Sequence, residues 1–516
     1  MAPTDDLRPI DIDRLGLDDI PDIARRGRSI RIPEQTMARV ADGRRHIEDL
    51  AGRPEPTYGV STGFGALATI AIPPERRAAL QVSLTRSHAA GSGPLVEAEV
   101  VRAMMALRLH TLCTGRTGVR TQVVTTLAGL LNAGITPEVH EYGSLGCSGD
   151  LAPLAHVAIV LQGEGRVRTA DGSPRPAGEA LAEAGLPVVT LAEKEGLALI
   201  NGTDGMLGML ALALADLDLL LKVADITTAM SIEALLGTDR AFAADLIAMR
   251  PHAGQARSAA NLRSLLAGSP IVASHRDDRA HLVQDAYSMR CAPQVAGSAR
   301  DTVDHARAVA QRELDSIIDN PVVTEDGRVE SNGNFHGAPV AHVLDFLAIP
   351  VADVASISER RTDRLLDRAR NQGLPAFLAH EVGVDSGYMI AQYTAAGIVS
   401  ECKRLAAPAS VDSIPSAAMQ EDHVSMGWAS ARKLTTAVHG LRQVLAIELI
   451  VAGRALDLRA PLEPAPGTAA ALSALRTAVA GPGSDRIVAD EIRAADELIA
   501  SGAILGAVVG VIGDLQ

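Results

Sequence analysis

The 516-residue sequence contains few aromatic residues and few cysteines. Aromatic residues make up 2% of the chain, as five Phe, five Tyr and one Trp, so the core cannot be built mainly from large rings. The four cysteines are far apart and form no C-x-x-C pair, which argues against a disulfide framework or a zinc knuckle; they are Cys113, Cys147, Cys291 and Cys402. We therefore expect reduced thiols in a cytoplasmic protein.

The chain also lacks an excess of basic residues and an uninterrupted apolar segment. Its 48 Lys and Arg face 62 Asp and Glu, and the net charge of −14 argues against a non-specific nucleic-acid partner. Residues 1–22 lack the cationic-then-apolar order of a secretory signal, so we expect no export. Residues 206–221 are apolar but contain Asp216 and Asp218, whereas a membrane span needs about 20 mostly apolar residues. We expect no membrane partner.

What the sequence does contain is apolar helical periodicity. Apolar residues recur at three- and four-residue spacing over residues 205–236, 338–370, 388–405 and 429–458. The last stretch has one apolar face, with Glu448 at its edge, formed by Leu434, Val438, Leu441, Leu445, Leu449 and Ala452. We predict a mainly α fold: a loop-rich N-terminal region over residues 1–202, a long-helix bundle over 203–516, and minor β-ribbons near 166–169 and 322–329.

A glycine-rich turn, Tyr58-Gly-Val-Ser-Thr-Gly-Phe-Gly65, stands out from this helical background. Its continuation over residues 63–68 formally matches G-x-G-x-x-A, a pattern that can mark a dinucleotide site. However, no βαβ unit surrounds it, and no acidic residue follows about 20 positions later. We therefore expect no nucleotide cofactor.

Residues 141–156 offer three chemical interpretations. The segment lacks the G-x-S-x-G of a nucleophile elbow, yet Cys147 or Ser148 with His156 could act as nucleophile and base. It could instead be a tight turn before a helix, with Asp150 as the cap. In the third interpretation the Gly149 nitrogen attacks the carbonyl carbon of residue 147. Loss of two waters then closes a five-membered ring and converts Ser148 to a dehydroalanine, a reaction that requires the close approach glycine permits.

The wider sequence supports the third interpretation through a family resemblance. Gly143-Ser-Leu-Gly-Cys-Ser-Gly-Asp-Leu-Ala-Pro-Leu154 resembles the signature of the aromatic amino acid ammonia-lyases, whose tripeptide cyclises to 4-methylidene-imidazole-5-one (MIO). The resemblance extends over nearly the whole chain, through residues 58–65, Ser87-His-Ala-Ala-Gly91, Leu199-Ile-Asn-Gly-Thr203, Val283-Gln-Asp-Ala-Tyr-Ser-Met-Arg290, Gly333-Asn-Phe-His-Gly337 and Gln420-Glu-Asp-His-Val-Ser-Met426. Within the family the motifs resemble most closely the histidine-specific, actinobacterial type.

Two positions depart from the usual pattern of the family. Residue 147 is Cys where Ala is commoner, but ring closure uses only the backbone carbonyl of this residue. Met419 stands where many bacterial relatives carry Asn, which could alter the pocket wall. Neither departure conflicts with the cofactor.

The resemblance implies non-oxidative elimination of ammonia from L-histidine, giving trans-urocanate in the first step of histidine degradation. It implies an MIO group formed autocatalytically from Cys147, Ser148 and Gly149, with no metal and no nucleotide; H-E-x-x-H is absent from the sequence. The electrophile captures the substrate amine or, in a competing proposal, the imidazole ring, and the sequence does not choose between them. Tyr58 is the implied base for the β-proton.

The remaining implied roles concern substrate binding. Arg290 is the implied carboxylate clamp, because a guanidinium binds a carboxylate bidentately, and three-residue spacing would place Gln284 and Tyr287 on the same helical face. The resemblance places Asn201 and Tyr287 around the electrophile and the amine, and Phe335 in the pocket wall. Local sequence alone allows plainer roles, an N-cap for Asn201 and a helix-terminal cap for His88.

Two positions bear on substrate choice. The resemblance implies that His88 and Glu421 receive the imidazole ring. Glu421 can accept a hydrogen bond from a ring N–H, which phenylalanine lacks. His88 by itself is ambiguous, because tyrosine lyases also carry histidine there.

Several alternatives stay open from the sequence. Within the same chemistry they are an aminomutase and a tyrosine lyase. Outside it they are a hydrolase built on Cys147, Ser148 and His156, and a non-catalytic helical assembly protein. For His156, His336 and His423 we expect structural hydrogen bonds. Family members are homotetramers whose sites are shared between subunits, so the resemblance also implies a homotetramer.

Overall fold

The computed structural model describes residues 8–53, 57–276 and 283–516, and helices dominate them. Residues 1–7, part of the segment for which we expect no export signal, lie outside the described residues. The chain divides into two compact units. Unit 1 comprises Met1–Leu212, Arg307–Leu344 and Ala409–Arg432, and unit 2 comprises Ala213–Ala306, Asp345–Pro408 and Lys433–Gln516. The sequence-based boundary after residue 202 stays a prediction.

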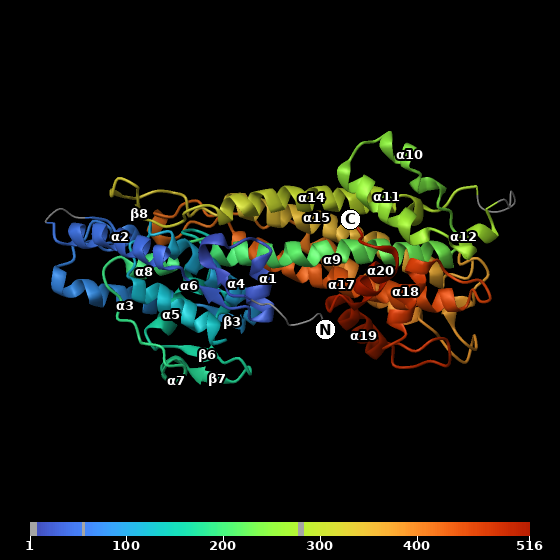
Figure 1. Ribbon diagram of the computed structural model, residues 1–516, viewed down its shortest axis with the longest axis horizontal. Helices are drawn as coiled ribbons and strands as arrows, with labels where there is room; N and C mark the ends of the chain where they lie inside the picture. The colour runs from blue at the N-terminus through green and yellow to red at the C-terminus, as the bar shows by residue number, and fades with distance from the viewer. Residues whose placement is uncertain (1–7, 54–56, 277–282) are drawn as a thin grey trace. The chain divides into compact units, whose positions relative to one another are not determined.

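Unit 1 contains eight complete α-helices among its described residues (Figure 1): α1 (Asp19–Arg26), α2 (Glu34–Ala51), α3 (Arg77–His88), α4 (Ala98–Cys113), α5 (Thr121–Asn132), α6 (Leu151–Leu161), α7 (Ala177–Glu183) and α8 (Glu195–Ile200). Helix α4 packs against α1 and α5, and α6 packs against α3 and α8. Almost every side chain of α4 is buried, as expected for a helix that is apolar all round. This arrangement fixes the turn that precedes α6.

Unit 1 also holds the small β-sheets of the described chain. Strands β1 (Ile10–Asp11) and β2 (Ile30–Arg31) pair in parallel, and β3 (Ser92–Leu95) pairs antiparallel with β5 (His140–Tyr142). A three-stranded sheet joins β4 (Thr136–Pro137), β6 (Arg166–Arg168) and β7 (Pro174–Pro176), and β8 (Val322–Val323) pairs with β9 (Val329–Glu330). The predicted ribbons near 166–169 and 322–329 are confirmed.

Unit 2 contains α10 (Ala244–Ala248), α11 (Ala253–Leu266), α12 (Pro270–Ser274), α13 (Tyr287–Arg290), α16 (Met389–Leu405), α18 (Pro466–Leu475), α19 (Val488–Ala500) and α20 (Ala503–Ile512). Helix α18 packs against α11 and α20. Four longer helices contain residues of both units: α9 (Asp204–Ala234), α14 (Ala292–Leu314), α15 (Ala338–Leu366) and α17 (Gly427–Asp457). The predicted mainly α fold is confirmed, and the four predicted helical stretches correspond to α9, α15, α16 and α17.

The apolar face predicted for α17 is buried throughout, but the position of Glu448 differs from the prediction. Its side chain is fully buried instead of lying at the edge of the face. Its carboxylate accepts hydrogen bonds from Nε and Nη2 of Arg361 on α15, at 2.5 and 2.9 Å. Hydroxyls of three further residues donate to it, those of Thr227, Ser231 and Ser358. A fully bonded carboxylate can thus occupy the core of unit 2.

Among the described residues, α15 and α17 are long and apolar enough to cross a membrane by length and composition alone, and the bent pair α19 and α20 would be a third candidate. In α15 and α17 67% of the most apolar window is buried inside the protein. The buried pair of Arg361 and Glu448 also joins these two helices. We therefore interpret α15 and α17 as core helices.

The single tryptophan, Trp428, lies in the part of α17 that belongs to unit 1. It is 3% exposed, and its indole N–H donates to the carbonyl of Glu141 at 2.8 Å. A β-carbon on Gly205 would lie 2.5 Å from the indole ring, so glycine is needed at that contact. Trp428 therefore joins α17 to β5 and to the first turn of α9.

Removing the guanidinium that pairs with Glu448 should strongly destabilise unit 2. We expect Arg361→Met to lower the free energy of unfolding by about 3–5 kcal/mol, because it leaves a buried carboxylate without a counter-charge. Arg370→Met is the control: Arg370 is 56% exposed and pairs with Asp367 on the surface, so about 1 kcal/mol or less is expected. Urea denaturation followed by far-UV circular dichroism measures both, and equal losses would contradict the prediction.

Candidate active site

The tripeptide Cys147-Ser148-Gly149 lies in a tight bend between β5 and α6. Gly149 has a φ of 80°, in the left-handed region, and a β-carbon there would lie 2.0 Å from the carbonyl oxygen of Gly202. Gly146 has a φ of 68°, and a β-carbon there would lie 2.2 Å from Oγ of Ser425. Both positions accept only glycine, because backbone conformation and space exclude a side chain.

Hydrogen bonds hold this bend from two sides. On one side, Gly149 forms a β-bridge with Gly202, and the N–H of Asp150 donates to the Gly202 carbonyl at 2.8 Å. On the other side, Oγ of Ser425 donates to the Gly146 carbonyl at 3.1 Å, and the N–H of Met426 donates to the Leu145 carbonyl at 3.0 Å. The backbone around Ser148 is therefore fixed within unit 1.

Asp150 precedes α6 as predicted, but its side chain does not cap that helix. Its carboxylate instead accepts the N–H groups of Gly205 and Met206, both at 2.9 Å, in the first turn of α9. Oγ of Ser144 donates to its other oxygen at 3.0 Å. Burial raises the pKa of Asp150 to about 7, against these hydrogen bonds, which favour the charged form. Asp150 thus connects the bend to α9.

Two cavities of unit 1 meet at Ser148. The first has a volume of about 520 Å³, and the predicted site residues in its lining are Tyr58, His88, Ser148, Asn201 and Glu421. The second has a volume of about 640 Å³, and those in its lining are Tyr58, Cys147, Ser148, Phe335 and Glu421. The structure therefore brings together seven predicted residues, which come from six separate parts of the sequence, next to Gly149.

The other predicted site residues belong to unit 2 and line neither cavity. Helix α13 contains only Tyr287–Arg290, so the expectation that Gln284 shares its helical face is wrong, because Gln284 precedes the helix. The guanidinium of Arg290 lies over the Tyr287 ring, 4.7 Å from its centroid. Nε of Arg290 is buried and has no hydrogen-bond partner among the described residues.

His88 and Glu421 present hydrogen-bonding groups to the first cavity. His88 ends α3, and its Nδ1 lies 2.9 Å from the carbonyl oxygen of Leu84. Burial lowers the pKa of His88, while the Leu84 carbonyl and the nearby charge of Glu421 oppose this shift. Because a carbonyl oxygen only accepts, neutral His88 carries its proton on Nδ1 and offers Nε2 as an acceptor. Glu421 accepts a hydrogen bond from Oγ of Ser416 at 3.1 Å.

Tyr58 and Asn201 are fixed by backbone groups. The N–H of Gly65, in the 3₁₀ turn Gly65–Leu67, donates to the Tyr58 hydroxyl oxygen at 3.3 Å. Asn201 follows the last residue of α8 as its C-cap, so the N-cap considered for it is wrong. Its Nδ2 donates to the Asn320 carbonyl at 2.8 Å.

The hydrolase interpretation is not supported by the geometry. Burial, with a further contribution from Glu421, raises the pKa of the Cys147 thiol to about 12, the opposite of an activated nucleophile. Nε2 of His156 accepts the N–H of Gly91 at 3.1 Å, and burial lowers the pKa of His156 to about 4. His156 therefore has a structural hydrogen bond, as expected.

Two other histidines of the motifs, His336 and His423, contact each other. Their rings stack with centroids 5.7 Å apart, and Nε2 of His336 lies 3.3 Å from the His423 carbonyl.

The sequence did not predict a group of buried charges near Asn201, a residue that lines the first cavity. Nζ of Lys194 lies 2.5 Å from Oδ2 of Asp319, and both side chains are fully buried. Arg108, also fully buried, donates to the carbonyl oxygens of Asn201 and Ile318. The sequence does contain one signal for this group: only four of its 48 basic residues are lysines, which makes each lysine a candidate for a specific role. Over the described residues, no group of three or more His, Cys, Asp or Glu side chains is placed to hold a metal ion.

The close approach of Gly149 to Gly202 can be tested against a matched glycine. Gly172 has a similar φ of 82° but no atom within 4 Å of an added β-carbon. We expect Gly172→Ala to cost roughly 1–2 kcal/mol through backbone strain alone. Gly149→Ala should cost about 1–3 kcal/mol more, because its β-carbon overlaps the Gly202 carbonyl. Chemical denaturation of both variants measures the difference, and equal losses would show that the approach is not tight.

Comparisons with known proteins agree with this arrangement. A sequence profile of the family described as Aromatic amino acid lyase matches residues 15–477. A histidine ammonia-lyase from Streptomyces coelicolor is 62% identical over 499 residues, covering 96% of this chain and 97% of that protein. One from Sorangium cellulosum is 50% identical, covering 97% and 99%.

Solved structures of the same architecture are similar over nearly the whole chain. A tyrosine aminomutase from Streptomyces globisporus has a TM-score of 0.94 at 36% identity, covering 99% of this chain and 100% of that one. A histidine ammonia-lyase from Trypanosoma cruzi has a TM-score of 0.90 at 39% identity, covering 98% and 95%. The resemblance seen in the motifs is confirmed: the chain is an ammonia-lyase and belongs to the aromatic amino acid lyase family.

Proposed function

We propose that this enzyme eliminates ammonia from L-histidine to give trans-urocanate, the first step of histidine degradation. The observation that carries the proposal is that His88 and Glu421 line the same cavity as Ser148. A neutral imidazole ring has one N–H that Glu421 can accept, whereas a phenyl ring would leave this carboxylate unpaired. The relatives named histidine ammonia-lyase support the same substrate.

We propose that Cys147, Ser148 and Gly149 form the MIO group. The residues present fit it, because the bend at Gly149 leaves no room for a β-carbon and its neighbours are held by hydrogen bonds. Ring closure joins the Gly149 nitrogen to the carbonyl carbon of Cys147, with that carbonyl oxygen leaving as one water and Oγ of Ser148 as a second. When formed, the group supplies an electrophilic methylidene carbon that unmodified side chains lack.

The other residues of the first cavity bind and orient the substrate. Glu421 accepts the single N–H of the neutral substrate ring, and His88 lines the same cavity beside it. Tyr58 removes the β-proton, and the N–H that Gly65 donates to its hydroxyl oxygen stabilises negative charge there. Asn201 accepts a hydrogen bond from the substrate amino group. Phe335 forms part of the apolar wall of the second cavity.

We also propose that Gln284, Tyr287 and Arg290 act on the substrate within a homotetramer that shares its sites between subunits. Arg290 would bind the substrate carboxylate, which would satisfy its Nε, a group that no described residue bonds, or the neighbouring Nη groups. Tyr287, 71% exposed and stacked on Arg290, would lie beside the amine.

We further propose a cytoplasmic location. The four cysteines form no disulfide, which is compatible with this location.

An aminomutase is the second candidate, because the tyrosine aminomutase from Streptomyces globisporus has the same architecture at a TM-score of 0.94. Such an enzyme would return ammonia to the β-carbon. Incubation with L-histidine separates the two: urocanate absorbance supports the lyase, and β-histidine without urocanate supports the mutase. If neither urocanate nor β-histidine is formed, both proposals fail for this substrate.

Changing the serine of the tripeptide should abolish both the cofactor and turnover. The wild-type chain is expected to be lighter than its sequence by two waters, and Ser148→Ala should have its full mass and no urocanate formation. Cys147→Ala is the matched control, since ring closure uses only the backbone of residue 147; it should keep the mass deficit and activity. Intact-mass spectrometry and urocanate absorbance measure both. Turnover by Ser148→Ala would refute the cofactor assignment.

Changing Glu421 should alter substrate choice. We expect Glu421→Gln to lower kcat/KM for L-histidine by about 10- to 100-fold, since a hydrogen bond to a charged group contributes roughly 1.5–3 kcal/mol. The ratio of L-phenylalanine to L-histidine turnover should rise, because the uncharged amide costs less to bury against a phenyl ring. Asp412→Asn, an exposed carboxylate outside both cavities, serves as the control. An unchanged ratio would exclude Glu421 as a specificity residue.

A further inference from the structure

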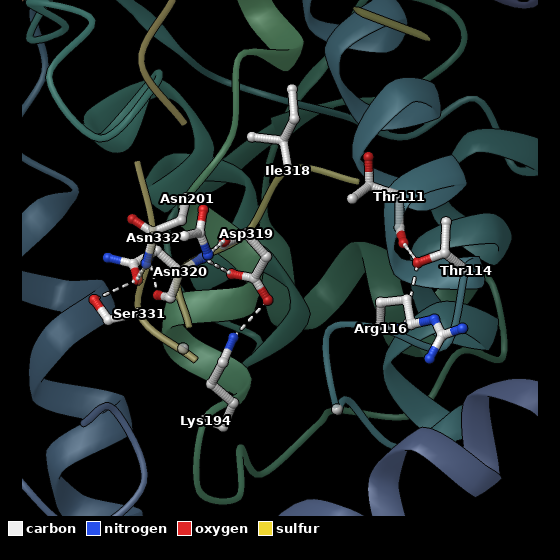
Figure 2. A network of polar contacts seen from close by, with 12 residues as sticks. Thr111, Thr114, Arg116, Lys194, Asn201, Ile318, Asp319, Asn320, Ser331 and Asn332 are labelled. Atoms are coloured by element: carbon white, nitrogen blue, oxygen red, sulfur yellow. Dashed lines mark hydrogen bonds and ion pairs between the residues drawn. The ribbon is translucent and has the colours of Figure 1, made fainter. Parts of the chain in front are cut away.

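A buried lysine and a buried aspartate are connected through hydrogen bonds to Asn201, which lines the first cavity. Lys194 precedes α8 with a φ of 75°, in the left-handed region that non-glycine residues seldom adopt. Its Nζ lies 2.5 Å from Oδ2 of Asp319, and neither side chain is exposed (Figure 2). Buried charges are tolerated when they are paired and hydrogen-bonded, and this pair meets both conditions.

The second oxygen of Asp319 continues this contact toward the site. Oδ1 accepts the N–H of Asn320 at 2.8 Å, and the Asn320 carbonyl accepts Nδ2 of Asn201 at 2.8 Å. Figure 2 shows these contacts running from Lys194 through Asp319 to the two asparagines. One carboxylate thus fixes the peptide group preceding Asn320, the residue that binds the Asn201 side chain.

Side chains on the opposite side hold the same residues. Oδ1 of Asn320 accepts Oγ of Ser331 at 3.0 Å and the N–H of Asn332 at 3.1 Å. Nδ2 of Asn332 donates to the Asp319 carbonyl at 3.0 Å. Both the side chain of Asn320 and the backbone of Asp319 are therefore restrained by neighbours other than Lys194.

Arg108 connects the backbones of the two segments. One of its Nη atoms donates to the Asn201 carbonyl, and the other donates to the Ile318 carbonyl at 2.8 Å. Further along, the N–H of Val323 donates to the Arg116 carbonyl at 2.7 Å. With the backbone of Asn201 held by Arg108, its side-chain orientation depends on where the Asn320 carbonyl lies.

This geometry determines which end of the Asn201 amide is available to a ligand. The Asn320 carbonyl only accepts, so it must face the amide nitrogen of Asn201, and the amide oxygen is left as the acceptor. We propose that Lys194 and Asp319 are positioning residues that hold Asn201 with its amide oxygen toward the amino group of the substrate. The inference rests on the proposed function, because it takes an amino acid as the substrate.

A double-mutant cycle tests whether Asp319 acts through Asn201. Asn at position 319 keeps the shape but offers one oxygen where two donors, from Lys194 and Asn320, require acceptors. We expect Asp319→Asn to lower kcat/KM for L-histidine about 10-fold. In an Asn201→Ala background the same change should lower it no further than about twofold, because the residue it positions is gone. Multiplicative losses would overturn the inference.

Glu195→Gln is the matched control. Glu195 is the next residue on α8, is fully buried, and pairs with Arg120, with Oε2 and Nη2 2.7 Å apart. This change breaks an ion pair whose carboxylate is as buried as that of Asp319, although Arg120 is 33% exposed, and among the described residues no hydrogen bond joins Glu195 to Asn320. Any loss of kcat/KM that Glu195→Gln causes should multiply with the loss caused by Asn201→Ala. If Glu195→Gln causes no further loss in the Asn201→Ala background, the cycle reports general damage and the inference fails.

An amine-free ligand supplies a readout that a purely structural role would not produce. 3-(Imidazol-4-yl)propionate has the ring and carboxylate of histidine but no amino group. For Asp319→Asn, its inhibition constant should stay within about twofold of wild type while kcat/KM for L-histidine falls. Equal weakening of both would overturn the positioning role. If Asp319→Asn does not fold, Lys194→Met takes its place in the same experiments.

Failure of the proposed function is distinguishable from failure of this inference. A wild-type enzyme that neither converts L-histidine nor binds the amine-free ligand would remove the proposed function. An active wild type with a multiplicative cycle would remove only the positioning role. Intact mass is measured on every variant, so that activity is expressed per chain carrying the two-water deficit.

Discussion

The candidate site depends on one close approach of two backbones, Gly149 against Gly202. The contact leaves no room for a β-carbon on either residue: at Gly149 it would meet the Gly202 carbonyl, and at Gly202 it would meet Asp204 and Arg108. Ser148 and Asn201, the neighbours of these glycines, are thereby fixed relative to each other. The spacing between Ser148 and Asn201 therefore depends on two residues without side chains.

Buried charges serve different purposes in the two units. In unit 2 the pair of Arg361 and Glu448 joins the long helices α15 and α17, so its hydrogen bonds add direction to the non-directional packing of their apolar side chains. In unit 1 the pair of Lys194 and Asp319 restrains a loop. Lysine suits the latter place because its single compact charge reaches one carboxylate oxygen and leaves the other for a backbone N–H.

The sequence predicted the long helices well, because α9, α15, α16 and α17 carry uninterrupted apolar periodicity. Family motifs predicted seven residues that the structure gathers around two cavities. Periodicity failed where charge is paired across distance: Glu448 looked like an edge residue because Arg361, 87 positions away, is invisible to a local pattern.

The same limit explains the other differences. Asp150 was expected to cap the helix that follows it, but the first turn of α9 supplies its donors from 55 positions away. The pair of Lys194 and Asp319 spans 125 positions and matches no motif. Gln284 was expected to share a helical face with Arg290, yet the helix begins only at Tyr287, too late to include it.

The scarcity of aromatic rings also gives the protein a built-in optical label. Trp428 is the only tryptophan, is buried in unit 1, and donates to the backbone of Glu141, a few residues before the bend that carries Ser148. Selective excitation of its indole would therefore produce emission from a single known position. A shift of that emission to longer wavelength would report water reaching the base of the bend, separately from the unfolding of helices in unit 2.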